Sequence, residues 1–284
     1  MENEMKNLYY FERIMGHKLT PPILFPCDNV DRVVSAILNF ERLFRNIFRS
    51  NALQSAYNEF YESYSAFEIH HQTKLVERRA RSYFVEFSVH IAHWEEYINN
   101  LAQKPRLKQF FQHLKEYTKK SCKEYFIAKL IRNYAVHFDE IIERFHVNSD
   151  GTELYFMRDN LFKLNSMRGI KNKRNIQKIQ QLPKEIALIP VIDKSYDALM
   201  KIHEQLIDFL IDERTQEDCS VLLELHSRII CAGLESKIWK VFDGLESLNP
   251  LKPTELEVLN IDWQGYLMVA SYIKDREISE CLTR

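Results

Sequence analysis

Apolar residues recur along most of the chain with a spacing of three or four positions. An α-helix has about 3.6 residues per turn, so each stripe of apolar side chains would lie along one helix face. Asp28 or Asn29 can cap the first such helix, and Pro105 would end the third. The stripes predict helices over residues 30–48, 53–67, 76–101, 107–117, 125–145 and 196–210, with two or three more over 217–282.

One segment interrupts this helical pattern. Polar and apolar side chains alternate on both sides of Ser149-Asp150-Gly151, as in strands that bury one face. A glycine tolerates the positive φ that a tight turn between two strands requires. The alternation and the turn together predict a β-hairpin near residues 144–158.

These elements define the expected fold class, which is mainly α. Amphipathic helices joined by short connections are typical of an antiparallel helical bundle. The bundle would contain one inserted β-hairpin and would continue into a helical C-terminal extension. We expect an N-terminal arm over residues 1–27, a helical domain over 28–210 and the extension over 211–284. Residues 182–192 contain two prolines and are expected to be extended.

The composition narrows the classes of function. Six glycines in 284 residues, and no GxGxxG or GxxxxGK[ST] motif, argue against the common nucleotide-binding folds. The five cysteines are scattered and include no CxxC pair, which argues against a disulfide framework. We therefore expect the protein to be located in the reducing cytoplasm. The charged N-terminus is unlike a signal peptide, and no apolar run is long enough for a membrane span, so we expect no membrane association.

Positive charge gathers in one region of a chain whose formal net charge is only −1. Residues 158–178 hold seven lysines and arginines and a single acid, Asp159. A solvated loop is one reading of such a run, and contact with an RNA backbone is the other. In the second reading the RNA-binding residues are Arg168, Lys171, Lys173, Arg174 and Lys178.

The sequence Leu130-Ile131-Arg132-Asn133-Tyr134-Ala135-Val136-His137 carries the strongest chemical signal. On a helical wheel Arg132 and Asn133 lie opposite the apolar stripe, and His137 flanks it four residues after Asn133. Val136 would project away from the core. Such a face combines a cation, a hydrogen-bonding amide, an imidazole and an exposed apolar group.

These side chains suit the cleavage of a phosphodiester bond without a metal. A histidine can transfer protons to or from ribose oxygens near neutral pH, and an arginine fork can stabilise charge on phosphate oxygens. Asn133 could orient either group. One copy of the motif is too small to supply both an acid and a base, whereas a symmetric dimer would supply a second copy.

The Arg132-Asn133-xxx-His137 run resembles the R-x4–6-H motif of the HEPN superfamily. The following hairpin, the Arg158-Asp159-Asn160-Leu161-Phe162 segment and a later helix extend the similarity over about residues 70–210. The resemblance implies a helical metal-independent endoribonuclease, homodimeric through the motif helix, with Arg132, Asn133 and His137 as catalytic residues. It also implies a place in phage defence or in a toxin–antitoxin system, with an antitoxin or defence complex as partner.

Two other patterns compete with this interpretation. Arg106 and His113 also fit R-x6-H, but no polar residue follows Arg106, so we interpret that match as chance. His90 and His93 have a spacing that can hold zinc, yet no third ligand is evident. Arg132 and Asn133 could equally form a plain solvated helix face, with His137 bonded to a carboxylate.

The leading functional hypothesis is therefore a cytoplasmic endoribonuclease that binds RNA and needs no metal or other cofactor. A non-catalytic helical module that binds RNA or a protein within a larger assembly is the alternative. A helical nucleotide-binding protein without nuclease activity is a third possibility. Loss of cleavage on substitution of His137 would favour the enzyme, whereas binding that depends only on the basic segment would favour the module.

Overall fold

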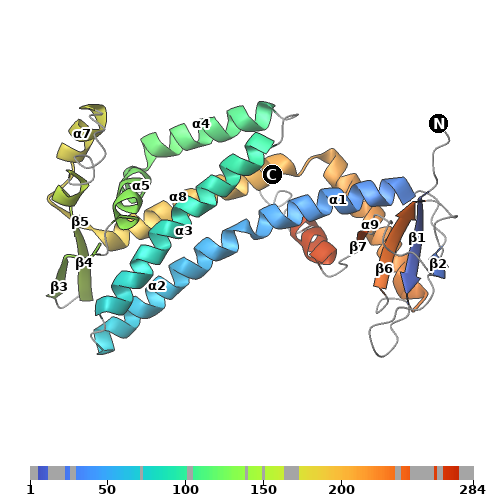
Figure 1. The fold of residues 1–284 in the computed structure, drawn as a ribbon, viewed down its shortest axis with the longest axis horizontal. Helices are drawn as coiled ribbons and strands as arrows, with labels where there is room; N and C mark the ends of the chain where they lie inside the picture. The colour runs from blue at the N-terminus through green and yellow to red at the C-terminus, as the bar shows by residue number, and fades with distance from the viewer. Residues whose placement is uncertain are drawn as a thin grey trace. The chain divides into compact units, whose positions relative to one another are not determined.

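The computed structural model describes residues 6–11, 23–25, 30–70, 73–100, 105–137, 140–148, 151–162, 173–233, 238–243, 259–260 and 265–274. Contacts divide the chain into two compact units. One unit is Arg49–Leu206, and the other joins Met1–Phe48 to Ile207–Arg284. The structure confirms a mainly α fold with an inserted hairpin (Figure 1).

The Arg49–Leu206 unit is built around three long helices, α2 (Asn51–His70), α3 (Thr73–Asn100) and α8 (Leu188–Leu210). In Figure 1, α2 and α3 lie side by side, and α8 crosses α3. The Tyr83 hydroxyl of α3 donates to the carbonyl of Ile192 on α8 at 3.0 Å, and Tyr57 of α2 donates to Asp193 at 3.0 Å. Large aromatic side chains that are fully buried form much of the core: Phe60, Tyr83, Phe84, Phe87, Trp94 and Phe156.

Two shorter helices, α4 (Pro105–Ser121) and α5 (Lys123–Ala135), follow α3. Proline suits the first position of α4 because it lacks the N–H that a helix start leaves unbonded. Cys122 separates the helices and caps α5, since its Sγ accepts a hydrogen bond from the Tyr125 N–H at 3.4 Å. The predicted helix over residues 107–117 is confirmed within α4.

The predicted hairpin is confirmed as β3 (Arg144–Asn148) and β4 (Gly151–Met157), which pair antiparallel. Gly151 has a φ of 128°, a region that residues with a Cβ avoid. A third strand, β5 (Glu185–Ala187), extends the sheet on the β4 edge. The inward face of β4 packs on α5, with the Phe156 ring 5.2 Å from that of Tyr134.

Two predicted boundaries are wrong. The helix expected to reach residue 145 ends at Ala135, and residues 140–143 are not helical. Residues 188–192, expected to be extended, are the first turn of α8. Pro190 is compatible with that turn because the first N–H groups of a helix have no partner within it.

The other unit joins the two ends of the chain. The α1 helix (Val30–Ile47), which the short 3₁₀ helix η1 (Phe48–Ser50) follows, packs against α9 (Glu213–Cys231). A sheet of order β2-β1-β6-β7 completes it, formed by β1 (Lys6–Phe11), β2 (Ile23–Phe25), β6 (Ile238–Asp243) and β7 (Leu259–Asn260). The C-terminal part is helical over α9 and residues 265–274, but it also contributes β6 and β7, which the periodicity did not predict.

Candidate functional site

The last turn of α5 places two of the predicted catalytic side chains in contact. Arg132 and Asn133 are both half-buried, and Arg132 Nη1 donates to Asn133 Oδ1 at 3.1 Å. Arg132 Nε is buried and has no hydrogen-bond partner among the described residues. No described carboxylate forms an ion pair with this guanidinium. Because no described carboxylate pairs with it, the guanidinium can use its terminal nitrogens to bind an external acceptor, whereas the buried Nε does not reach solvent.

The third predicted catalytic residue, His137, lies just outside the helix rather than within it. Val136 is the C-cap of α5, and His137 is exposed in the turn that follows, with its N–H bonded to the Tyr134 carbonyl at 2.9 Å. The helix on which Asn133 and His137 are predicted to lie one turn apart therefore ends before His137, and the contact between their side chains stays a prediction. The outward projection of Val136 is confirmed, since 46 % of its surface is exposed.

Two side chains of α3 hold the chain where α5 ends. Arg81 Nε donates to the Ala135 carbonyl at 2.9 Å, a carbonyl that the next helical turn would otherwise use. Glu77 Oε1 accepts the N–H of Ile141 at 3.0 Å. Arg81 and Glu77 lie one turn apart on α3, so a single helix face fixes both ends of the turn that carries His137. Sequence reasoning missed both residues, because their role depends on how α3 packs against α5.

A cluster of positive charge surrounds Phe126 on the same helix. Lys119 Nζ of α4 lies 5.8 Å from the centre of the Phe126 ring, and Lys178 Nζ lies 5.3 Å from it. Lys178 belongs to α7 (Lys173–Gln180), which contains the end of the basic segment, residues 158–178. Both lysines are exposed, and Phe126 is half-buried. The structure thus brings one predicted RNA-binding residue against the helix that carries Arg132.

The pKa of a third lysine, Lys129 on α5, also indicates that positive charges lie close together here. The pKa of Lys129 is lowered, first because the surrounding protein excludes water and next because Lys119 is positively charged. Lys115 and Arg132 lower that pKa further, whereas Glu95 raises it. Glu95 forms its ion pair with Lys115 at 2.7 Å. The face between α4 and the end of α5 is therefore positively charged.

The structure describes the remaining predicted RNA-binding residues only in part. Arg168 and Lys171 lie outside the described residues. Lys173 and Arg174 form the first turn of α7, where the structure describes only their backbone. Their proposed contact with RNA stays a prediction.

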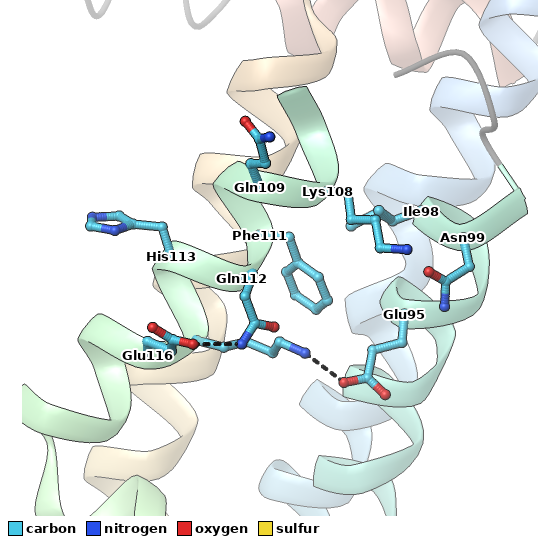
Figure 2. A pocket seen from close by; sticks show the side chains of 10 residues that line it. Glu95, Ile98, Asn99, Lys108, Gln109, Phe111, Gln112, His113 and Glu116 are labelled. Atoms are coloured by element: carbon cyan, nitrogen blue, oxygen red, sulfur yellow. Dashed lines mark hydrogen bonds and ion pairs between the residues drawn. The ribbon is translucent and has the colours of Figure 1, made fainter. Parts of the chain in front are cut away.

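A groove of about 700 Å³ lies between α3 and α4 (Figure 2). Its polar side chains largely bond to one another: Lys115 pairs with Glu95, and Gln112 Nε2 donates to Glu116 Oε1 at 2.8 Å. A second cavity, of about 630 Å³, lies between α4 and α8. His113, of the competing R-x6-H match, is at the rim of both. The paired charges make the groove a weaker anion site than the face around Phe126.

The two histidines considered for zinc face different surroundings. His93 is exposed, whereas His90 is buried, with its ring 5.2 Å from that of His203 on α8. Within the described ranges, no group of three or more His, Cys, Asp or Glu side chains is arranged to hold a metal. No helix in those ranges is long and apolar enough to cross a bilayer.

Comparison with models of known protein families, with curated proteins and with solved structures found no match. The resemblance to the HEPN superfamily therefore rests on the motif and on the elements that follow it.

Proposed function

We propose that the chain is a metal-independent endoribonuclease of the HEPN type. The observation that carries the proposal is the state of Arg132. Arg132 is half-buried, no described carboxylate forms an ion pair with its guanidinium, and it sits on a positively charged helix face. An arginine without a carboxylate partner is the group best suited to a phosphate, because its planar fork matches phosphate oxygens.

The reaction would begin at the ribose 2′-OH next to the scissile phosphate. The 2′ oxygen forms a bond to phosphorus while the bond from phosphorus to the 5′ oxygen breaks, which leaves a 2′,3′-cyclic phosphate and a 5′-hydroxyl. A proton leaves the 2′-OH and another reaches the departing 5′ oxygen; His137 would transfer one of them. Arg132 would stabilise the charge on the phosphate oxygens, and Asn133 would orient the Arg132 guanidinium through the bond they share.

The test compares wild-type protein with His137→Ala and Arg132→Lys on labelled RNA in excess EDTA. The chain offers matched controls in His113→Ala and Arg106→Lys, which alter the competing motif match on α4. We expect the wild type and both controls to produce 2′,3′-cyclic phosphate ends. His137→Ala and Arg132→Lys should each slow cleavage about 100-fold or more, because lysine cannot replace the fork.

Two outcomes would contradict the proposal. One is unchanged cleavage by His137→Ala or Arg132→Lys. The other is no cleavage of structured and unstructured RNAs by folded, dimeric wild-type protein.

A non-catalytic RNA-binding module is the second candidate, and one observation favours it. His137 lies in the exposed turn after α5, so the helix that carries Arg132 does not itself hold His137. In that case the protein would bind RNA without cleaving it, and His137→Ala would leave binding unchanged.

A further inference from the structure

The Phe126 ring holds together two lysines that are far apart in sequence. Lys119 is in the last turn of α4 and Lys178 in the last turn of α7, and their ammonium groups lie 5.8 and 5.3 Å from the ring centre. The face of an aromatic ring carries negative charge, so it attracts both ammonium groups and offsets part of their mutual repulsion. The ring thereby fixes the positions of two side chains that would otherwise move freely in solvent.

No described carboxylate neutralises this pair. Among the described residues, neither Lys119 nor Lys178 forms an ion pair, and the same is true of Lys129 on α5. Glu95, the acid whose charge acts on Lys129, is bound to Lys115. Cations from α4, α5 and α7, three helices that lie near one another in Figure 1, thus gather without an ion-pair partner among the described residues, an arrangement that favours an external polyanion.

The cluster and the proposed catalytic arginine belong to the same helix, with Arg132 about 120° around the axis of α5 from Phe126. Phe126 and Arg132 are six residues apart on α5, which is about 9 Å along the helix axis. Lys129 lies between them and interacts electrostatically with both Lys119 and Arg132. A strand whose phosphates contact the lysines around Phe126 could therefore place a neighbouring phosphate at Arg132.

We propose that Lys119 and Lys178, which lie against the Phe126 ring, and Lys129, about one turn further along α5, bind the phosphates of single-stranded RNA and position the strand for Arg132. The inference rests on the proposed function, since it assigns the substrate path of that same site. A single strand fits because its phosphates can approach lysines from α4, α5 and α7 without the geometry of a duplex.

The test measures binding of the full chain to a single-stranded 2′-O-methyl RNA. This strand has no free 2′-OH and cannot be cleaved by the proposed reaction, so binding is separated from catalysis. Binding is followed by fluorescence anisotropy from low to high salt for the wild type and for the double variant Lys119→Gln/Lys178→Gln. Lys108→Gln is the control, because Lys108 is an exposed lysine about 16 Å away along α4.

The expected result is a change in salt dependence. Each phosphate contact on a single strand contributes about 0.7 to the slope of log K against log salt, so the double variant should lose about 1.4. Lys108→Gln should keep the wild-type slope. Phe126→Leu keeps all the charges but removes the ring, so it should weaken binding while leaving the slope close to that of the wild type.

Three results would overturn the inference: an unchanged slope in the double variant, an equal loss in Lys108→Gln, or full displacement of the strand by inorganic phosphate at constant ionic strength. The last would indicate a small-anion site. Failure of this inference is distinguishable from failure of the proposed function. If the salt slope of the double variant is unchanged while cleavage depends on His137, only the proposed lysine binding site is wrong. If binding depends on the lysines but no RNA is cleaved, only the proposed nuclease activity is wrong.

Discussion

At the scale of single residues, two histidines, His90 and His203, are buried in a core that is otherwise mainly apolar. His90 is 2 % exposed, and its pKa is lowered to about 3, chiefly because burial excludes water and next because His203 lies close to it. Trp94 Nε1 donates to His203 Nδ1 at 3.3 Å, which fixes that nitrogen as an acceptor. His90 Nε2 has no hydrogen-bond partner among the described residues. The core therefore holds His90 in its neutral form.

This burial predicts a loss of stability in acid. A histidine in the unfolded chain has a pKa of about 6.5, so between pH 6.5 and 3 the unfolded state binds a proton that folded His90 does not. The free energy of unfolding should fall as the pH decreases through this window, by up to about 1.4 kcal/mol per pH unit from this residue. Urea denaturation at several pH values, with wild type beside His90→Asn, measures the difference.

His93→Asn is the matched control, because His93 is exposed on the same helix. It should keep the steep acid dependence of the wild type, whereas His90→Asn should flatten it. Equal pH dependence in wild type and His90→Asn would show that His90 is not held neutral.

At the scale of elements, one buried carboxylate links α9 to α1. Asp218 is fully buried; it pairs with Arg32 at 3.0 Å and accepts a hydrogen bond from Asn39 Nδ2 at 2.6 Å. Its neighbour Glu217 pairs with the same arginine at 3.1 Å, but 71 % of its side chain is exposed. The two acids thus share one partner and differ in their contact with water.

Their substitution should give different results for this reason. Asp218→Asn removes a buried charge and should lower the free energy of unfolding by about 3 kcal/mol, because it breaks a buried pair. Glu217→Gln breaks only an exposed pair and should change it by less than about 1 kcal/mol. Chemical denaturation of both variants decides this. Equal effects would mean that burial does not determine the strength of the α1–α9 contact.

The elements also show which parts of the fold could be predicted from the sequence. The hairpin could be predicted because alternation and the Ser149-Asp150-Gly151 turn are local signals, and β3 and β4 confirm it. The end of α5 could not be predicted, since the apolar spacing continues to Phe145. Arg81 and Glu77 of α3 bond to the backbone at and beyond Ala135, and a contact between distant residues leaves no periodic trace.

The same distinction holds for the candidate site. Arg132 and Asn133 lie on α5 as the local pattern predicts, but both are half-buried, which a helical wheel cannot show. Phe126 and Lys119 were missed, because the apolar stripe made Phe126 look like an ordinary core residue. A signal was present in retrospect: Phe126 precedes Lys129 by one turn, next to a helix that ends in Lys119-Lys120.

At the scale of the whole molecule, both units depend on contacts between segments far apart in sequence. In one unit, β1 near the N-terminus pairs with β6, for example Leu8 with Val241. In the other, the motif helix is held by α3 and by β4. Arg132 and Asn133 on this helix are half-buried, and Val136, which follows it, is exposed.

That exposed end leads to the last prediction, which concerns assembly. One chain supplies one Arg132 and one His137, but the proposed reaction moves two protons, so we propose that a second copy completes the site. An exposed valine beside the motif suits a two-fold contact, because each copy buries the other's apolar side chain.

Val136→Asp should therefore abolish both the dimer, measured by analytical ultracentrifugation, and the cleavage of RNA in EDTA. Val147→Asp is the control, since Val147 is 77 % exposed on β3, away from the motif, and should change neither. Full cleavage by a monomeric Val136→Asp protein would mean that one chain suffices, and that a second group on the same chain carries the other proton.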